Sequence, residues 1–217
     1  MYIVVILPCR GRKEQTLDVV RRLLATSGLQ HGVDWKLVLV SGTDDADIVE
    51  SVASQCSVFG VVDNAPRLSY WEALQIGSQE HKASFYVCVA NDVLPCINWL
   101  TIAHKKMLDT FSDGVGIVGF NGDGHGESHS CHFMISEVLL EWYGGWPVWY
   151  HHNFGDTELV TRARQQGRYV KSPWAILFHD HPWIAAKEDD RVYGEGRSQA
   201  DSDSMLFMLR KANGWKH

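Results

Sequence analysis

An aspartate directly follows one of the most apolar segments of this sequence. Residues 87–90 read VCVA, Asn91 and Asp92 come next, and the chain turns apolar again at Val93. The apolar run predicts a buried strand, so Asp92 stands where that strand ends. An aspartate in this position most often caps the following turn. The chemical alternative is a ligand for a hard divalent cation, which prefers carboxylate oxygens.

His179 ends a later apolar segment, 174–178, in the same way, and Asp180, His181 and Pro182 follow it. A lone histidine more often has a surface or core role. An imidazole beside a carboxylate, however, shifts the metal preference toward ions such as Mn²⁺. Asp92 and His179, at two strand ends, are therefore candidate ligands of one divalent cation.

Asp156 follows Gly155 and precedes a helical pattern that runs to about residue 166. Capping of the helix is a complete structural explanation for an aspartate at this place. A general base that takes the proton from an attacking hydroxyl is the chemical explanation. The sequence supports the two about equally, and one residue can do both.

Three arginines, Arg10, Arg12 and Arg67, stand beside predicted strand ends. Solvated surface charge is the common role of such residues. Next to a diphosphate they would instead provide charge-assisted hydrogen-bond donors.

The first half of the chain alternates between strands and helices. Ser69 and Glu72 have the spacing of a capping box at the start of the third helix. Alternation of this kind predicts a parallel sheet with helices on both faces, and ligands of such sheets lie beyond the carboxyl ends of the strands. The predicted strands are 2–7, 35–40, 58–62 and 84–90, and the predicted helices are 14–27, 45–54, 69–79 and 98–110.

Each of these strands ends in polar or turn residues, so we expect four polar strand ends, 8–12, 41–45, 63–64 and 91–92, to converge on one site. The second half is more irregular and ends in a polar tail, 187–204, and an amphipathic segment, 205–212. Its other predicted elements are strands at 116–120, 131–135 and 174–178, helices at 136–143 and 156–166, a glycine-rich loop at 121–130 and an aromatic, turn-rich stretch at 144–155.

Composition limits the classes of function. The chain has 217 residues, of which 45% are hydrophobic and 21% charged, as in a globular domain. Its net charge of −6 disfavours non-specific binding to nucleic acid. No apolar run reaches the roughly 20 residues that span a bilayer, and the first residues read as a strand. The five cysteines are scattered, which favours reduced thiols and a cytoplasmic location.

Several common motifs are missing from the sequence. There is no G-x-x-x-x-G-K-[ST] phosphate loop, no G-x-G-x-x-G between the first strand and the first helix, and no G-x-S-x-G nucleophile elbow. His125, His129, Cys131 and His132 are dense enough to suggest zinc. They lack the paired spacing of known zinc ligands, so we interpret their segment as a polar loop.

With these residues in hand, the chain resembles the family 2-like group of GT-A glycosyltransferases over roughly residues 2–185. Residues 8–12 resemble the P-x-x-x-R start of that family, and 39–44 resemble its second strand and nucleotide-contacting turn. Residues 90–92 lie where the family has its D-x-D motif, with Ala90 at the first acidic position. Residues 155–159 resemble the motif that supplies the catalytic base, and 179–182 resemble the late metal-binding histidine region.

The resemblance implies one α/β domain of GT-A type, with a mostly parallel, Rossmann-like sheet. Its parts would be a nucleotide-sugar half (1–115), an acceptor and catalytic half (116–182) and a C-terminal tail and helix (183–217). It also implies transfer of a sugar from a nucleotide-diphosphate sugar, foremost a UDP-sugar, to an acceptor hydroxyl, with Mn²⁺ or Mg²⁺ as cofactor. The implied donor-binding residues are Pro8, Arg10, Ser41, Asp44, Asp63, Arg67, Asn91 and Asp92.

Within that set, Asp44 and Asp63 would contact the base or ribose, and Arg10 and Arg67 the phosphates. The implied metal ligands are Asp92, His179 and His181, and the implied catalytic base is Asp156. Attack by a hydroxyl that Asp156 deprotonates, from the face opposite the leaving group, predicts inversion. A retaining outcome stays open because it depends on the donor pose.

More than one acceptor and more than one class of protein are compatible with these residues. A glycan or small molecule is the expected acceptor, and a hydroxymethylated DNA base is a rarer one. Arg162, Arg164 and Arg168 could form a local basic face for DNA, although a solvated helix face explains them better. A nucleotidyltransferase of related fold and a catalytically silent sugar-nucleotide-binding protein are the other candidates.

Overall fold

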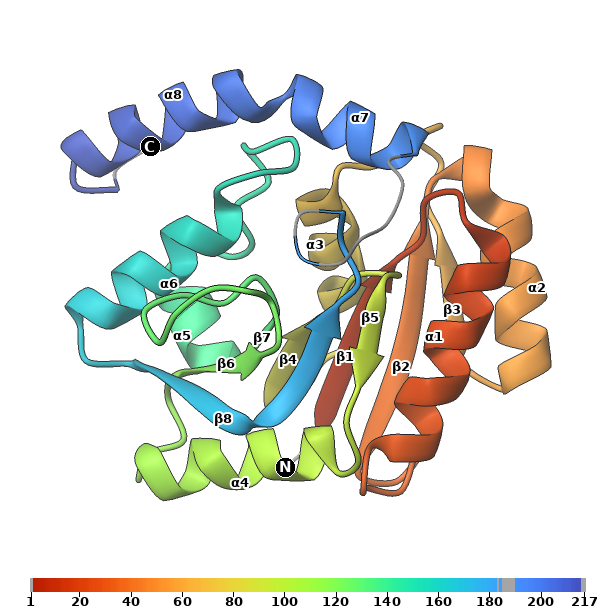
Figure 1. The fold of residues 1–217 in the computed structure, drawn as a ribbon, viewed down its shortest axis with the longest axis horizontal. Coiled ribbons are helices and arrows are strands. Elements are labelled where there is room, and N and C mark those ends of the chain that lie inside the picture. The colour runs from red at the N-terminus through yellow and green to blue at the C-terminus, as the bar shows by residue number, and fades with distance from the viewer. Residues whose placement is uncertain (1, 183, 185–189, 216–217) are drawn as a thin grey trace.

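A computed structural model describes residues 2–182, 184 and 190–215, which fold around one eight-stranded sheet of order β3-β2-β1-β4-β7-β6-β8-β5 (Figure 1). The strands are β1 (Ile3–Pro8), β2 (Trp35–Ser41), β3 (Phe59–Val62), β4 (Phe85–Cys88), β5 (Val93–Pro95), β6 (Ile117–Asn121), β7 (Phe133–Ser136) and β8 (Tyr169–His179). The α-helices are α1 (Lys13–Thr26), α2 (Ala46–Cys56), α3 (Tyr70–Glu80), α4 (Trp99–Thr110), α5 (Glu137–Trp142), α6 (Gly155–Gln165), α7 (Arg191–Ser198) and α8 (Ala200–Ala212), and one 3₁₀ turn covers Thr43–Asp45.

The first half confirms the predicted parallel sheet with helices on both faces. Strands β3, β2, β1 and β4 are neighbours, and every pair among them is parallel. Alternate residues of β1 enter different cores. Val5 and Leu7 pack in the core formed with α1, α2 and α4, while Val4 and Ile6 pack in the core formed with α3, α5 and α6. A continuous apolar run is what a strand buried on both faces requires.

The rest of the sheet is mixed, because β6 and β8 are parallel while three other pairs are antiparallel. Strand β7 is antiparallel to β4 and β6, and the short strand β5, which the sequence did not predict, is antiparallel to β8. Strand β8 begins at Tyr169, five residues before the predicted start. Its register with β6 shifts between Gly119 and Asn121, and Pro173, which has no N–H to donate, lies in the irregular part.

The predicted polar tail is largely helical. Asp190 caps α7 by accepting hydrogen bonds from the N–H groups of Val192 and Tyr193, and α8 follows to Ala212. The two helices form one band along the top of Figure 1, above α3 and α6. Residues 187–189 of the predicted tail lie outside the described residues, as do 183, 185, 186, 216 and 217. None of the described helices is long and apolar enough to cross a membrane.

The predicted capping box at the start of α3 is confirmed. Ser69 Oγ accepts a hydrogen bond from the Glu72 N–H at 3.1 Å, and Glu72 Oε2 accepts one from the Ser69 N–H at 2.7 Å. We expect Ser69→Ala to lower the free energy of unfolding by about 1 kcal/mol, because the Glu72 N–H at the start of the helix loses its acceptor. Urea unfolding measures this loss. Ser54→Ala, in the exposed face of α2, is the matched control, and equal effects of the two changes would contradict the expectation.

Candidate functional site

A cleft of about 1360 Å³ lies beyond the carboxyl ends of β1, β2 and β4. The strand ends, the start of α3, helix α7 and the loops at 123–132 and 151–157 line it. Pockets for single small ligands are roughly 300–1,000 Å³. The cleft therefore has room for an extended ligand or for two ligands side by side.

Asp92 lies in this cleft and is only 4% exposed. Its Oδ1 is 3.2 Å from His179 Nε2, and its Oδ2 accepts a hydrogen bond from the Tyr193 hydroxyl at 3.0 Å. Arg12 Nη1 is 3.6 Å from the same Oδ2. Burial would raise the pKa of Asp92, but His179 and Tyr193 lower it below its usual range. The carboxylate is thus held as an anion.

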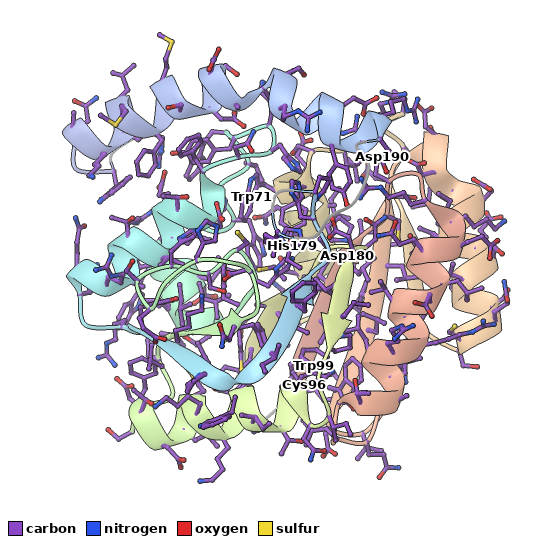
Figure 2. All side chains as sticks on the ribbon, in the orientation of Figure 1. Trp71, Cys96, Trp99, His179, Asp180 and Asp190 are labelled. Atoms are coloured by element: carbon purple, nitrogen blue, oxygen red, sulfur yellow. The ribbon has the colours of Figure 1, made fainter. Side chains whose placement is uncertain are left out.

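Strand β5 is the reason that Asp92 and His179 meet. Val93 pairs with His179 in the β5–β8 ladder, and the Asp180 N–H donates to the Asp92 carbonyl at 2.8 Å. Figure 2 shows His179 and Asp180 near the middle of the molecule, with Asp190 above them at the start of α7. The two predicted metal ligands are therefore brought together by pairing between segments more than eighty residues apart.

Two more histidines extend the pair into a cluster. The His132 ring lies 4.7 Å from the His179 ring, and the His181 ring lies 5.1 Å from it. Burial and the neighbouring His179 lower the pKa of His132 to about 3, so its imidazole is neutral. Neutral imidazole nitrogen is the form that binds metals. His132 was not among the predicted ligands.

Buried polar atoms that lack hydrogen-bond partners indicate whether this cluster is suited to bind a cation. Within the described part of the chain, His132 Nδ1 and Ser41 Oγ are buried without a hydrogen-bond partner, and Asp92 Oδ1 has no contact of hydrogen-bond geometry beside its 3.2 Å ion pair with His179 Nε2. Buried polar atoms in native proteins nearly always have partners. A carboxylate oxygen and an imidazole nitrogen with unused lone pairs are the donors that a divalent cation would satisfy.

The predicted donor-binding residues divide into two groups. Pro8, Arg10, Ser41, Arg67, Asn91 and Asp92 line the cleft. Asp44 instead lines an adjoining hollow of about 250 Å³ and accepts a hydrogen bond from Arg67 at 3.1 Å. Asp63 lines neither space, and its Oδ1 accepts the Ala65 N–H at 2.8 Å within its own turn.

The turn after β2 is held by a close backbone approach at Gly42. A Cβ at this position would lie 2.5 Å from the Ala65 carbonyl oxygen. The N–H groups of Thr43 and Asp44 donate to the carbonyls of Ala65 and Pro66 at 2.9 and 3.0 Å. The segment after β3 is thereby fastened to the end of β2, and Arg67 is brought beside Asp44.

Helix α7 supplies contacts that the sequence did not predict. Glu195 forms ion pairs with Arg10 and, at 3.6 Å, with Arg67. Asp190 accepts two hydrogen bonds from Arg12, both at 2.6 Å, and the Arg12 guanidinium stacks 3.8 Å above the Tyr193 ring. All three arginines at the strand ends are thus paired with acidic residues of the C-terminal segment.

Asp156 lies in the first turn of α6 and lines the cleft. The N-cap position belongs to Phe154, at φ 67°, so the interpretation of Asp156 as the helix cap is wrong. Gly155 is required by packing, because a Cβ there would lie 2.2 Å from the Trp71 ring. Asp156 Oδ1 accepts the Thr157 N–H at 2.8 Å, and Oδ2 is 3.2 Å from His129 Nε2. Burial would raise the pKa of Asp156, but His129 lowers it, so the carboxylate is ionised and able to accept a proton.

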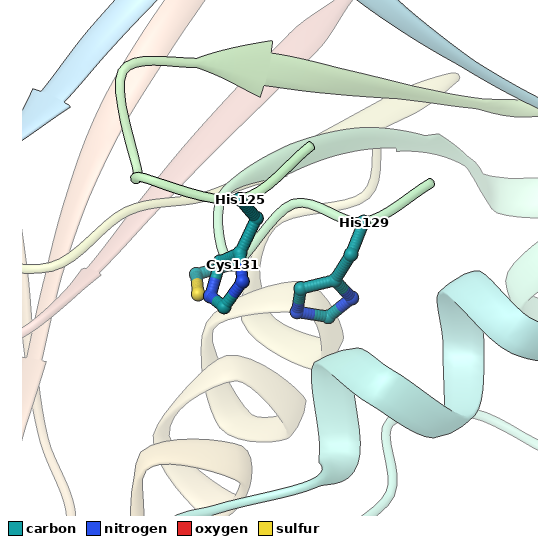
Figure 3. A group of neighbouring side chains, drawn as sticks. All are labelled: His125, His129 and Cys131. Atoms are coloured by element: carbon teal, nitrogen blue, oxygen red, sulfur yellow. The ribbon is translucent and has the colours of Figure 1, made fainter. Parts of the chain in front are cut away.

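The loop before β7 brings His125, His129 and Cys131 together (Figure 3). One ligand atom from each residue lies within 4.8 Å of the other two, the one such trio among the residues that the structure describes. The sequence favoured a simple polar loop here, because the spacing of the three residues matches no paired pattern. His129 also contacts Asp156, which places the trio at the edge of the cleft.

Solved structures with the same fold are glycosyltransferases. Mannosyltransferase PcManGT from Pyrobaculum calidifontis, in complex with GDP-Man and Mn²⁺, superposes with a TM-score of 0.63 at 16% identity, over 81% of this chain and 55% of that one. S. aureus TarS 1-349, in complex with UDP-GlcNAc, gives 0.67 at 13% identity over 89% and 61%. The catalytic domain of Drosophila beta1,4galactosyltransferase 7, in complex with xylobiose, gives 0.54 at 14% identity over 91% and 80%.

These matches confirm the predicted GT-A fold. The chain spans only 55% and 61% of the length of PcManGT and of the TarS fragment. No model of a known protein family matches the chain, and no curated protein matches it.

Proposed function

We propose that this chain, which has the GT-A fold, is a metal-dependent glycosyltransferase that moves a sugar from a nucleotide-diphosphate sugar to an acceptor hydroxyl. The observation that carries the proposal is the buried Asp92–His179 pair, 3.2 Å apart, in a 1360 Å³ cleft at the strand ends. Two proteins of the same fold are described with GDP-Man and Mn²⁺ and with UDP-GlcNAc. These ligands support a nucleotide-sugar donor for this cleft.

Asp92 and His179, with His132 or His181 beside them, would hold Mn²⁺ or Mg²⁺. When bound, the cation supplies Lewis-acid stabilisation of the negative charge on the departing diphosphate. The Tyr193 hydroxyl and the Arg12 guanidinium hold the Asp92 carboxylate from the other side. Their contacts orient Asp92 Oδ1 toward His179.

Arg10 and Arg67 line the cleft and are the proposed ligands of the donor diphosphate, for which guanidinium groups are suited. Both are paired with Glu195, so a bound diphosphate would compete with this carboxylate for them. Asp44, in the adjoining hollow, remains a candidate for a base or ribose contact. We leave Asp63 out of the proposed site because it lines neither space.

Asp156 is the proposed catalytic base. Its carboxylate is ionised, and it lines the cleft. A hydroxyl deprotonated there would attack the anomeric carbon from the face away from the diphosphate, which corresponds to inversion.

A glycan or a small molecule is the proposed acceptor. Two of the three arginines considered as a basic face for modified DNA are instead paired with acidic residues of the protein. Arg162 pairs with Glu158 at 3.2 Å and stacks 4.1 Å from the Tyr143 ring, and Arg168 pairs with Asp113 at 2.8 Å. A net charge of −6 also disfavours a polyanionic acceptor. The five free cysteines support a reducing compartment such as the cytoplasm.

A thermal-shift measurement with GDP-Man, UDP-GlcNAc and UDP, each with and without Mn²⁺, tests the donor site. At a ligand concentration about a hundred times Kd, binding stabilises the folded state by about 2.7 kcal/mol. For a chain of this size that raises Tm by roughly 5–10 °C. We expect the shift with at least one nucleotide to need Mn²⁺ and to be lost in Asp92→Asn.

Asp109→Asn is the matched control, because Asp109 is 58% exposed on α4 and pairs only with Lys105 there. It should keep the full shift. Absence of any nucleotide-dependent shift in the wild type would contradict the proposal. Binding without turnover in the presence of acceptors would indicate the silent binding protein, and release of pyrophosphate from a nucleoside triphosphate would indicate the nucleotidyltransferase.

A further inference from the structure

The trio His125, His129 and Cys131 offers two imidazole nitrogens and one thiol sulfur within 4.8 Å of one another. All three come from one loop, and Figure 3 shows their side chains converging on a common point. The His125 and His129 rings meet edge to face, with centroids 4.6 Å apart. The Asp156 carboxylate is next to the group, at 3.2 Å from His129 Nε2. Two nitrogens, one sulfur and one carboxylate are a complete ligand set for a tetrahedral ion.

A buried ion pair holds the loop in this arrangement. Lys171 and Asp123 are 2.9 Å apart, and each side chain is 1% exposed. Lys171 Nζ donates to the carbonyls of His125 and His129 at 2.8 and 2.9 Å. The Asp123 carboxylate accepts the N–H groups of His125 and Cys131 at 3.2 and 2.8 Å. The backbone of every ligand residue is therefore fixed by the same pair, although the three residues lie in a glycine-rich loop.

The chemistry of these ligands differs from that of the Asp92 cluster. Thiolate and imidazole favour borderline-soft ions such as Zn²⁺ over the hard ions that carboxylate sites prefer. His132, the residue after Cys131, has its ring against His179 and so belongs to the other cluster. The two sets of ligands are adjacent in the chain, but they share none of their side chains.

We propose that His125, His129 and Cys131 form a Zn²⁺ site, separate from the Asp92–His179 site, with Asp156 as the fourth ligand. On binding, Cys131 releases its thiol proton to solvent and its sulfur forms the bond to zinc. The ion replaces the contact between His129 and Asp156, which lies at 3.2 Å in its absence. This site requires neither a nucleotide nor an acceptor.

Zinc at this site would occupy the carboxylate that we propose as the catalytic base. This consequence rests on the proposed function: Zn²⁺ would inhibit sugar transfer while leaving Mn²⁺-dependent donor binding intact. The binding of zinc itself does not depend on that function, so each can fail without the other.

Cobalt substitution tests the site directly, because a Co²⁺–thiolate bond gives an intense near-ultraviolet charge-transfer band. We expect one equivalent of Co²⁺ to produce this band in the wild-type protein without nucleotide, and one equivalent of Zn²⁺ to abolish it. Cys131→Ser should lose the band. Cys96→Ser is the matched control, since Cys96 is also half-buried but lies at the end of β5, away from the trio.

A misfolded Cys131→Ser protein would also lose the band, so His125→Ala is the second variant. His125 is exposed, and its replacement should leave the fold intact. It should weaken Zn²⁺ binding by at least about tenfold, measured by competition with a chromophoric chelator. The Mn²⁺-dependent thermal shift with nucleotide should persist in both variants. Absence of the cobalt band in the wild type, or its survival in Cys131→Ser, would overturn the proposal, whatever the outcome of the donor-binding assay.

Discussion

Asp156→Asn is expected to lower kcat for sugar transfer by about 10²–10⁴-fold, the usual contribution of a general base. Asparagine has the same size, and its amide oxygen can still accept the Thr157 N–H, which Asp156 Oδ1 accepts at 2.8 Å. It cannot take a proton from an acceptor hydroxyl. The helix start should be preserved, because the N-cap is Phe154 and Asp156 does not cap the helix.

Initial rates at saturating donor and acceptor, in buffer cleared of zinc by a chelator and resupplied with Mn²⁺, measure this effect. The nucleotide-dependent thermal shift should be unchanged, because the proposed role of Asp156 is to deprotonate the acceptor and not to bind the donor. Asp113→Asn is the matched control, since Asp113 is 47% exposed and pairs with Arg168 at 2.8 Å. Retention of wild-type kcat in Asp156→Asn would remove Asp156 from the mechanism.

Arg210→Met is expected to lower the free energy of unfolding by about 3–5 kcal/mol, the usual cost of removing one partner of a buried ion pair. Arg210 makes two hydrogen bonds, of 2.8 and 2.9 Å, to Glu158, whose side chain is fully buried. Glu158 also accepts a hydrogen bond from the Tyr150 hydroxyl at 2.8 Å. The change leaves a buried carboxylate without its main cation and frees α8 from α6.

The loss of stability in Arg210→Met should depend on pH, and the lowered pKa of Glu158 gives the direction of this dependence. Burial would raise the pKa of Glu158, but Arg210 and Tyr150 lower it below the unfolded value of about 4.3. The pair therefore stabilises the folded state above that unfolded value, and its contribution is lost as the pH falls through the folded pKa. The difference between wild type and Arg210→Met should accordingly shrink below about pH 4.

Urea unfolding between pH 3 and pH 8 measures both quantities. Lys105→Met removes an exposed i,i+4 pair with Asp109 and is the matched control, expected to cost less than about 1 kcal/mol. Combining Arg210→Met with Glu158→Gln should recover part of the lost stability, because residue 158 then carries no buried charge. The recovery is partial because Arg162, 3.2 Å from Glu158, also loses its carboxylate partner. A loss in Arg210→Met no larger than in the control would contradict the assigned role.

Apart from β5, local signals were sufficient for the elements of the first half. The apolar run that forms β1 needs burial on both faces wherever it lies, and the Ser69–Glu72 capping box acts within one helical turn. The order of strands and helices then selected a parallel sheet, because parallel neighbours require crossover connections. Asp92, His179 and Asp156 were selected for the same reason: each follows or begins an element whose ends the sequence marks.

Contacts between segments distant in the sequence could not be predicted from local signals. The pairing of Asp92 with His179 depends on β5, a strand of three residues that pairs with β8. Arg12 reaches Asp92, while Arg10 turns to Glu195. The backbone of Arg12 is left-handed there, at φ 55°, and the partner of Arg10 is supplied by α7. Nothing in the polar tail predicted that Tyr193 and Glu195 would line the site, or that Asp190 would pair with Arg12.

The sequence by itself determined the fold class, the edge of the sheet at which a ligand would bind, and the acidic and imidazole residues available there. These follow from hydrophobic periodicity and from residue types at strand ends, which act over a few residues. Only the tertiary structure decided which of those residues touch. The trio His125, His129 and Cys131 shows why, because its geometry is imposed by Lys171 on β8, some forty residues farther along the chain.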